Sequence, residues 1–477
     1  MLTFRSLDNG RSEVDAPSME ELQSSFRGSL IDQKNAEYED RRRVWNSLID
    51  KKPALIAVCS GQADVVTAVK FARKHNILLS IRGGGHNVGG SALCDDGITI
   101  DLTEMRSVRV NQSENTVHVQ GGATLADVDR ETQVFGLATA TGNVSETGIA
   151  GLTLGGGFGN LRRKYGLSVD NLISVDIVNA DGQVMHASVD ENSDLFWAVR
   201  GGGGNFGVVT SFEFRLFPLG PEVYFASQFF DIGQASEVCR RWRDFMESAS
   251  EDISSLGFFW TVPEIDAFPK EIRGQRIFLY GALYAGSAEE GEKELAPLRD
   301  IGDPILDLSA KGPYCSWQAG FDAFFTPGAV YENIYAYWKS QYLNSLTNEH
   351  IDELVEAAHN MPSNQCLIAI WHLGGAMARV AEDATAFGKR NAPYMLSYDS
   401  CWIDPKISES VIAWTRKQVE ATERYASGGL YLNFPGVGEN TETLVRAAYG
   451  SNFDKLADVK RKYDPTNLFR VNQNIRP

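Results

Sequence analysis

The sequence predicts an α+β fold in two differently patterned parts, followed by a tail. Its 477 residues are long for a single hydrophobic core, and 43% of them are hydrophobic, so more than one core can form. The first part is rich in glycine, whereas between about 222 and 425 strands with period-two alternation are interleaved with amphipathic helices. Pro218 and Pro221 mark the boundary. We expect domains over 1–220 and 221–425, and a C-terminal segment over 426–477 that returns to the first domain.

The first part opens on a strand–helix–strand pattern. The apolar run Leu55–Val58 predicts a strand, and apolar residues at helical spacing predict a helix over 62–75 that ends at Asn76. A second apolar run, Ile77–Ile81, predicts the next strand. The three elements form a βαβ unit that leads the chain into the glycine-rich loop Arg82–Gly90.

Short strands and capped helices follow this loop. Thr124 and Asp127 have the spacing of a capping box, at the start of a helix that ends near Gly136. We expect Ser193 to cap another short helix, which stops at Gly201. The remaining apolar runs predict strands at Gly97–Leu102, Val108–Val110, Thr116–Gln120, Leu172–Asn179, Val184–Ala187 and Gly207–Leu216.

The second part mixes strands with helices. Alternation with a period of two predicts strands at Arg276–Tyr284, Tyr335–Tyr342, Gln365–His372 and Tyr394–Trp402. Amphipathic helices are expected at about 235–250, 288–299, 348–360 and 407–426. This mixture favours an antiparallel sheet that helices cover on one face.

Three glycine clusters, at 83–90, 155–159 and 201–207, stand out in the first part. A single cluster usually marks a tight turn. Three close together also let the backbone approach a ligand, and successive N–H groups can hold a pyrophosphate. Gly202–Gly207 matches the G-x-G-x-x-G dinucleotide motif, but a helix precedes it and a strand follows it. Because the Rossmann mechanism needs the opposite order, we reject that interpretation.

His86 lies inside the first cluster. A lone histidine is more often a structural hydrogen-bonding residue than a catalyst. The flanking glycines leave the backbone exposed, so the imidazole is presented to whatever the loop holds. Neutral imidazole is a competent nucleophile near pH 7. His86 is therefore a candidate for covalent attachment of a ligand.

The loop Arg82–Asn87 resembles the pyrophosphate loop of the vanillyl-alcohol-oxidase-type (PCMH-type) FAD-binding fold, most closely its berberine-bridge-enzyme-like branch. The resemblance continues through Gly155–Gly159 and Tyr165–Asn171, and resumes at Tyr431–Phe434 and Lys462–Asn467. It implies a two-part FAD-binding domain and a substrate domain whose sheet lies over the isoalloxazine. The residues that it assigns to the cofactor are Arg82, Gly83, Gly84, Gly85, His86, Asn87, Val88, Gly89, Thr141, Gly142, Thr147, Gly148, Gly151, Gly155, Gly157, Val208, Val209, Asn433, Asn472 and Asn474.

In that branch the histidine that matches His86 is bonded to the 8-alpha carbon of the flavin, so the resemblance implies FAD that is covalently bound through His86. Members with a second flavin bond carry a cysteine at the position of Val144. Since this loop contains no thiol, we expect a single attachment.

The resemblance implies hydride transfer from an alcohol, a sugar, an amine or a phenolic natural product to FAD. Oxygen would reoxidise the flavin and give hydrogen peroxide. A dehydrogenase with another electron acceptor and a flavin-binding protein without turnover remain as alternatives. Several aromatic residues of the second part either line the pocket or pack in the core. They are Tyr335, Tyr337, Trp338, Tyr342 and Trp371.

Tyr431 is the first candidate for the base that takes the substrate's proton. If Tyr431–Phe434 is a strand, Tyr431 and Asn433 share one face of a pocket wall. Free tyrosine has a pKa of about 10, so a cation such as Lys339 or Arg390 would have to lower it. A packed tyrosine without a catalytic role remains open, and Tyr342 and Tyr335 are the further candidates.

The composition restricts the partners. A formal net charge of −17 repels phosphate backbones and anionic lipids, which argues against nucleic acid and membrane partners. The six scattered cysteines form no metal-binding motif and fit a reducing compartment. The start of the sequence shows no secretory pattern, so we expect a cytoplasmic protein whose partners are a small-molecule substrate and molecular oxygen. The oligomeric state stays open.

Overall fold

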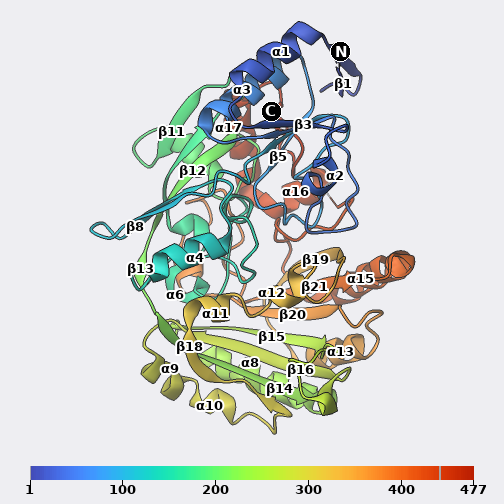
Figure 1. The fold of residues 1–477 in the computed structure, drawn as a ribbon. Helices are drawn as coiled ribbons and strands as arrows, with labels where there is room; N and C mark the ends of the chain where they lie inside the picture. The colour runs from blue at the N-terminus through green and yellow to red at the C-terminus, as the bar shows by residue number, and fades with distance from the viewer. Residues whose placement is uncertain (1, 440–441) are drawn as a thin grey trace.

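The computed structural model describes residues 2–439 and 442–477, and its fold is α+β (Figure 1). The first domain contains a four-stranded sheet in the order β3-β4-β6-β5. Its strands are β3 (Ser29–Asp32), β4 (Leu55–Val58), β6 (Ile98–Asp101) and β5 (Leu79–Arg82). Helix α3 (Gln62–Lys74) connects β4 to β5 and buries its apolar face, which confirms the βαβ unit. The two strands of the unit are not neighbours, because β6 lies between them and runs parallel to both.

A second sheet of the first domain is antiparallel. Its five strands have the order β11 (Val184–Ser188), β10 (Leu172–Val178), β12 (Val208–Arg215), β8 (Thr116–Gln120) and β7 (Val108–Asn111). Helix α4 (Leu125–Gln133) begins at the predicted capping box, in which the Thr124 amide donates to Asp127 at 2.8 Å. The prediction that Ser193 caps α7 (Ser193–Val199) is wrong, because the left-handed Asn192 holds that position and its side chain makes no capping bond.

The second domain is built on one large antiparallel sheet. The strand order is β17 (Leu306–Asp307), β14 (Glu222–Asp231), β16 (Arg276–Tyr284), β15 (Ile253–Thr261), β20 (Leu367–His372), β21 (Tyr394–Trp402) and β19 (Tyr335–Leu343), with β18 (Ala310–Pro313) also paired to β14. The four predicted strands are confirmed within two residues. The sequence did not predict β14 and β15, because both faces of these strands are largely buried and the alternation is lost.

Helices cover one face of this sheet, as predicted (Figure 1). They are α8 (Ala235–Ser248), α9 (Ala288–Glu294), α10 (Ala296–Arg299), α13 (Asn348–His359) and α15 (Ser408–Thr422). The single helix expected at 288–299 is divided because Pro297 stands at the start of α10, where a proline has no N–H to continue α9. The other face of the sheet, the cleft face, packs toward the first domain.

The C-terminal residues join the cores of the first domain. Helices α16 (Glu442–Tyr449) and α17 (Phe453–Tyr463) share a hydrophobic core with α7 and β12. The Lys460 ammonium donates to the Asn205 carbonyl at 2.7 Å, which fixes α17 beside the third glycine cluster. Leu468 and Phe469 pack into the core of the four-stranded sheet.

Shorter elements complete the described chain. They are β1 (Leu2–Arg5), β2 (Arg11–Val14), α1 (Ala16–Ser25), α2 (Tyr38–Arg41), β9 (Leu137–Ala138), α5 (Ile149–Leu154), α6 (Arg162–Tyr165), β13 (Phe217–Pro218), α11 (Tyr314–Gln318), α12 (Asp322–Phe325) and α14 (Ala376–Arg379). Among residues 2–439 and 442–477, the helices are all too short or too polar to cross a bilayer.

Candidate active site

A cavity of about 280 Å³ lies between the glycine loops of the first domain and the cleft face of the large sheet. The predicted site residues that line it are Gly83, Gly84, Gly85, His86, Asn87, Val88, Gly142, Thr147, Gly148, Gly151, Gly155, Val209, Asn433, Asn472 and Tyr431. They come from five separate stretches of the chain, which the fold brings around one space.

Six of the predicted cofactor residues do not line the cavity, namely Arg82, Gly89, Thr141, Gly157, Val208 and Asn474. The Arg82 guanidinium points away from it, donates to the Arg41 carbonyl and lies 3.8 Å from Asp101. Val208 faces the opposite side of β12 from Val209, as strand alternation requires.

The first glycine loop, Arg82–Gly90, and the loop Thr141–Gly148 touch backbone to backbone at Gly84 and Gly148. A side chain at either glycine would overlap the backbone nitrogen of the other. A larger residue does not fit where the two loops cross, so both positions need glycine for steric reasons. The contact holds the loop that carries His86 against the loop that carries Val144 and Thr147, and both loops face the cavity.

The imidazole of His86 is held by an aromatic stack and has an unpartnered nitrogen. It stacks on the Trp45 ring with centroids 4.5 Å apart and planes 20° apart. Its Nε2 is buried and has no hydrogen-bond partner among the described residues. The ring keeps some exposure to the cavity but lies deep below the protein surface, and this burial lowers its pKa to about 4. At neutral pH it is therefore uncharged, with a free nitrogen lone pair.

Trp45 contacts the site residue His86, and the sequence did not reveal this contact. It lies between α2 and β4, outside every glycine motif. Its Nε1 donates to the Phe325 carbonyl, so it connects the His86 loop to the second domain. A tryptophan in an irregular segment carries no signal of this role, and only the tertiary structure places it on His86.

Val144 lies where a second flavin attachment would need a thiol. Its side chain lines the cavity. The described cysteines all lie elsewhere and are free, and none of them lines this cavity.

The strand predicted at Tyr431–Phe434 is wrong. These residues form a turn in which the Phe434 amide donates to the Tyr431 carbonyl at 3.0 Å, and Pro435 follows. Tyr431 and Asn433 still lie together, because the Asn433 amide donates to the Tyr431 hydroxyl at 2.8 Å and to the Leu152 carbonyl at 3.0 Å.

Nothing in this turn makes Tyr431 a base. Burial raises the pKa of Tyr431 well above its ordinary value. The two cations considered from the sequence are occupied elsewhere. Lys339 points to the helix-covered face and pairs with Glu439 at 2.8 Å, and Arg390 pairs with Asp170 at 2.8 Å. The expectation that one of these cations lowers the pKa of Tyr431 is therefore wrong.

The other two candidate tyrosines lie outside the cavity lining. Tyr335 is on the helix-covered face of β19, where it stacks on Trp402 with centroids 6.1 Å apart, so it cannot reach a substrate. Tyr342 is on the cleft face, in the same core as Tyr431, but it is fully buried. Of the aromatic residues expected at the pocket, Trp338 and Trp371 line the cavity and Tyr337 does not.

Asp399 is the acidic side chain that the sequence did not single out. It lies on the cleft face of β21, opposite Trp338 on one neighbouring strand and Leu367 on the other, and all three line the cavity. It is 5% exposed, and its Oδ1 has no hydrogen-bond partner among the described residues. Burial raises its pKa to about 7, against a hydrogen bond from Ser397 that lowers it. The signal available in the sequence was that Asp399 is the one charged residue of β21.

Comparisons with known proteins identify the same two regions. A family model described as "FAD binding domain" matches residues 53–188, and one described as "Berberine and berberine like" matches residues 430–476. An FAD-linked oxidoreductase of Dictyostelium discoideum is 30% identical over 460 residues, which is 96% of each chain.

Solved structures agree along the whole chain. The crystal structure of 6-hydroxy-D-nicotine oxidase from Arthrobacter nicotinovorans is 27% identical, with a TM-score of 0.85, and the match covers 98% of this chain and 100% of that one. A structure of chitooligosaccharide oxidase is 25% identical, with a TM-score of 0.82, and covers 96% and 99% of the two chains.

The cavity of this chain fits FAD. Glycines from two loops, Gly83–Gly85 with Gly148 and Gly151, line it, so a ligand can lie directly against backbone, and His86, whose Nε2 has no described hydrogen-bond partner, lines the same space. The chain therefore belongs to the FAD-linked oxidoreductases of the berberine-bridge-enzyme-like family, and it is an FAD-dependent oxidoreductase.

Proposed function

We propose that the protein is an oxidase that carries FAD on a single covalent bond to His86. The observation that carries this proposal is the free Nε2 of His86, which lies in the glycine loop at the cavity. Because the pKa of His86 is lowered to about 4, the neutral nucleophile is present throughout the physiological pH range. Val144 stands where a second bond would need a thiol, which supports one attachment.

The reaction oxidises a small organic alcohol or amine. FAD, when bound, would supply the hydride acceptor, with oxygen as the reoxidant and hydrogen peroxide as the second product. The substrate loses a hydride from carbon and a proton from the neighbouring oxygen or nitrogen, so it leaves as a carbonyl compound or an imine. The names of two similar structures, a hydroxynicotine oxidase and a chitooligosaccharide oxidase, are consistent with substrates of these two chemical classes.

We propose Asp399, rather than Tyr431, as the acceptor of the substrate's proton. Asp399 lines the cavity, its Oδ1 has no described hydrogen-bond partner, and its pKa of about 7 allows it to accept a proton at neutral pH and release it afterwards. Tyr431 has no cation to ionise it. Its hydroxyl, held by the Asn433 amide, instead positions the substrate as a neutral hydrogen-bonding group.

Oxygen consumption by the purified holoenzyme tests the oxidase assignment. A substrate that bleaches the flavin under anaerobic conditions should, in air, consume oxygen and yield one hydrogen peroxide per turnover. If such a substrate reduces the flavin but oxygen reoxidises it only over hours, the protein is a dehydrogenase. No bleaching with any alcohol or amine would favour a binding protein without turnover.

A further inference from the structure

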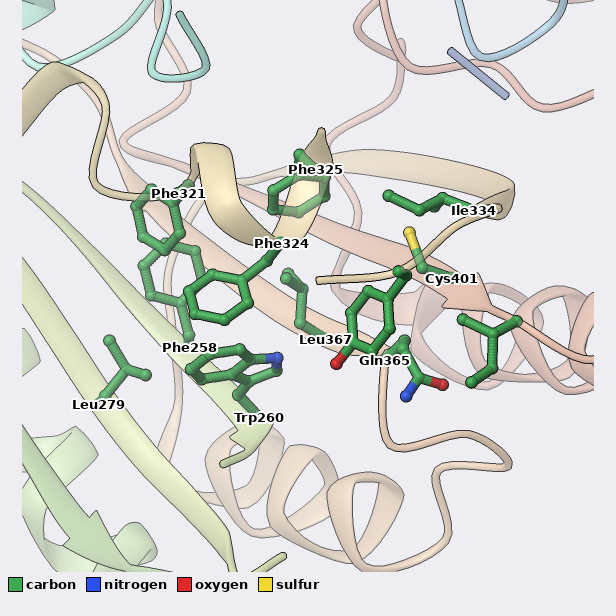
Figure 2. Close-up of a pocket in the computed structure, with 12 residues that line it drawn as sticks. Phe258, Trp260, Leu279, Phe321, Phe324, Phe325, Ile334, Gln365, Leu367 and Cys401 are labelled. Atoms are coloured by element: carbon green, nitrogen blue, oxygen red, sulfur yellow. The ribbon is translucent and has the colours of Figure 1, made fainter. Parts of the chain in front are cut away.

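A second, smaller pocket opens beside the active-site cavity. We call it the aromatic pocket and define it by Phe258, Trp260, Phe321, Phe324, Phe325 and Leu367 (Figure 2). Helix α12 and the turn before it supply three of the phenylalanines, and β15 supplies Phe258 and Trp260. Figure 2 shows the rings of Phe324, Phe258 and Trp260 turned toward one another across the pocket.

The aromatic pocket adjoins the active-site cavity. Phe258, Phe321, Phe325 and Leu367 line both spaces. Trp45, whose ring stacks on His86, also stacks on Phe325 with centroids 6.3 Å apart. The pocket therefore begins two ring contacts away from the proposed flavin attachment and shares a wall with the cavity, next to where a side group of a bound molecule would lie.

The size and chemistry of the pocket restrict that side group. Its volume is about 20 Å³, whereas roughly 10–15 Å³ holds one water molecule, so it has room for one or two methyl-sized groups. None of the described residues that line it is charged, and Gln365 and Tyr331 are the polar side chains among them. A buried methylene tightens binding about fourfold. A buried hydroxyl without a partner weakens it by roughly tenfold or more.

We propose that the aromatic pocket is the specificity subsite of this enzyme. It selects an aromatic or alicyclic alcohol or amine that carries a short alkyl branch of one or two carbons, and it rejects sugars. This inference rests on the proposed function for the reaction, but the fit of the branch is separate from the chemistry. Trp338 and Trp371 hold the body of the substrate in the main cavity, close to Asp399.

A series of 4-alkylphenols, from phenol to 4-butylphenol, tests the subsite by binding to the holoenzyme without turnover. Changes in flavin absorption and in tryptophan fluorescence give the half-saturating concentration of each compound. We expect that concentration to fall about fourfold for each of the first one or two carbons, and to rise again for propyl and butyl. Half-saturation that does not vary along the series would overturn the proposal, as would tighter binding of glucose or cellobiose than of 4-ethylphenol.

Variants of the pocket assign the effect to these residues. Phe324 lines only the aromatic pocket and packs against Trp260 with centroids 5.0 Å apart. Phe324→Leu enlarges the pocket and should move the best chain length up by at least one carbon; Trp260→Phe, a second enlargement, should do the same. The matched control is Phe225→Leu, a partly buried phenylalanine stacked on Trp317 at 4.7 Å in another core. It should leave the optimum unchanged.

An equal shift in Phe225→Leu, or no shift in either pocket variant, would contradict the subsite. Oxygen consumption by the holoenzyme tests the oxidase assignment separately. A chain-length optimum without peroxide formation would leave the subsite standing and remove the oxidase, whereas peroxide formation with no optimum would do the reverse.

Discussion

His86 and Trp45 lie ring on ring, with centroids 4.5 Å apart and planes 20° apart. The stack fixes the plane of the imidazole, while its Nε2 stays free of any described hydrogen-bond partner. Trp45→Leu removes the stacking partner and lets the imidazole turn, so covalent attachment of FAD should slow by about tenfold to a hundredfold. Acid-insoluble flavin, followed over time after FAD is added to apoprotein, measures the rate. Trp414→Leu, on the distant α15, is the control, and an equal slowing there would remove the role of Trp45.

Asp399→Asn keeps the shape of the side chain and removes its ability to accept a proton. Anaerobic reduction of the flavin by substrate should slow by about 10²–10⁴-fold, with FAD still bound. The matched control is Asp129→Asn, because Asp129 is also fully buried, also has a pKa raised to about 7, and does not line the cavity. Equal losses in the two variants would show that any buried carboxylate matters, and would remove the catalytic role of Asp399.

The pH dependence follows from the raised pKa of Asp399. Below about pH 7 its carboxyl group is protonated and cannot accept the substrate's proton, so the rate of flavin reduction should rise with pH and level off above about 7. In Asp399→Asn the slow residual rate should no longer rise with pH in this range. Stopped-flow absorbance from pH 5.5 to 9 measures both profiles, and a step of the same height and midpoint in the variant would contradict the assignment.

Tyr431→Phe should have a small effect. The variant loses a hydroxyl that positions the substrate but keeps the ring, which packs on Phe158 with centroids 4.4 Å apart. Because the pKa of Tyr431 is raised, the phenolate that a base would require is absent at neutral pH. We expect less than about a tenfold decrease in the anaerobic reduction rate. A decrease of a hundredfold or more would make Tyr431 the base and return Asp399 to a supporting role.

Gly148→Ala should destabilise the apoprotein by about 1–3 kcal/mol, because the added methyl group overlaps the Gly84 backbone. Gly151→Ala is the matched control, since the space around Gly151 is open and it lies within α5. Thermal unfolding of the two apoproteins measures the difference. If both variants melt at the wild-type temperature, the two loops do not cross as closely as described.

The sequence predicted those parts of the molecule whose structure is decided locally. The capping box of Thr124 and Asp127, and the strands β16 and β21, follow from patterns within a few residues. The strands β14 and β15 were missed because burial on both faces removes the alternation. The resemblance of the glycine loops to a known family located most of the cofactor cavity.

The catalytic part of the site depends on contacts that no local pattern records. Trp45 stacks on His86 from an irregular segment, Asp399 lines the cavity from the second domain, and neither belongs to a motif. The turn at Tyr431 is held in place by the tertiary contact of Asn433 with the Leu152 carbonyl, which no local pattern records, so the prediction of a strand failed. The pKa of a buried side chain depends on its surroundings, and these appear only after folding.

Peptide mass spectrometry of the digested holoenzyme tests the central claim most directly. The account predicts flavin on one peptide only, the one that contains His86, and no covalent flavin in His86→Ala. Val144→Cys serves as a positive control for the loop, since its thiol would lie at the cavity. Covalent flavin on another peptide of the wild-type protein, or covalent flavin retained in His86→Ala, would contradict the account.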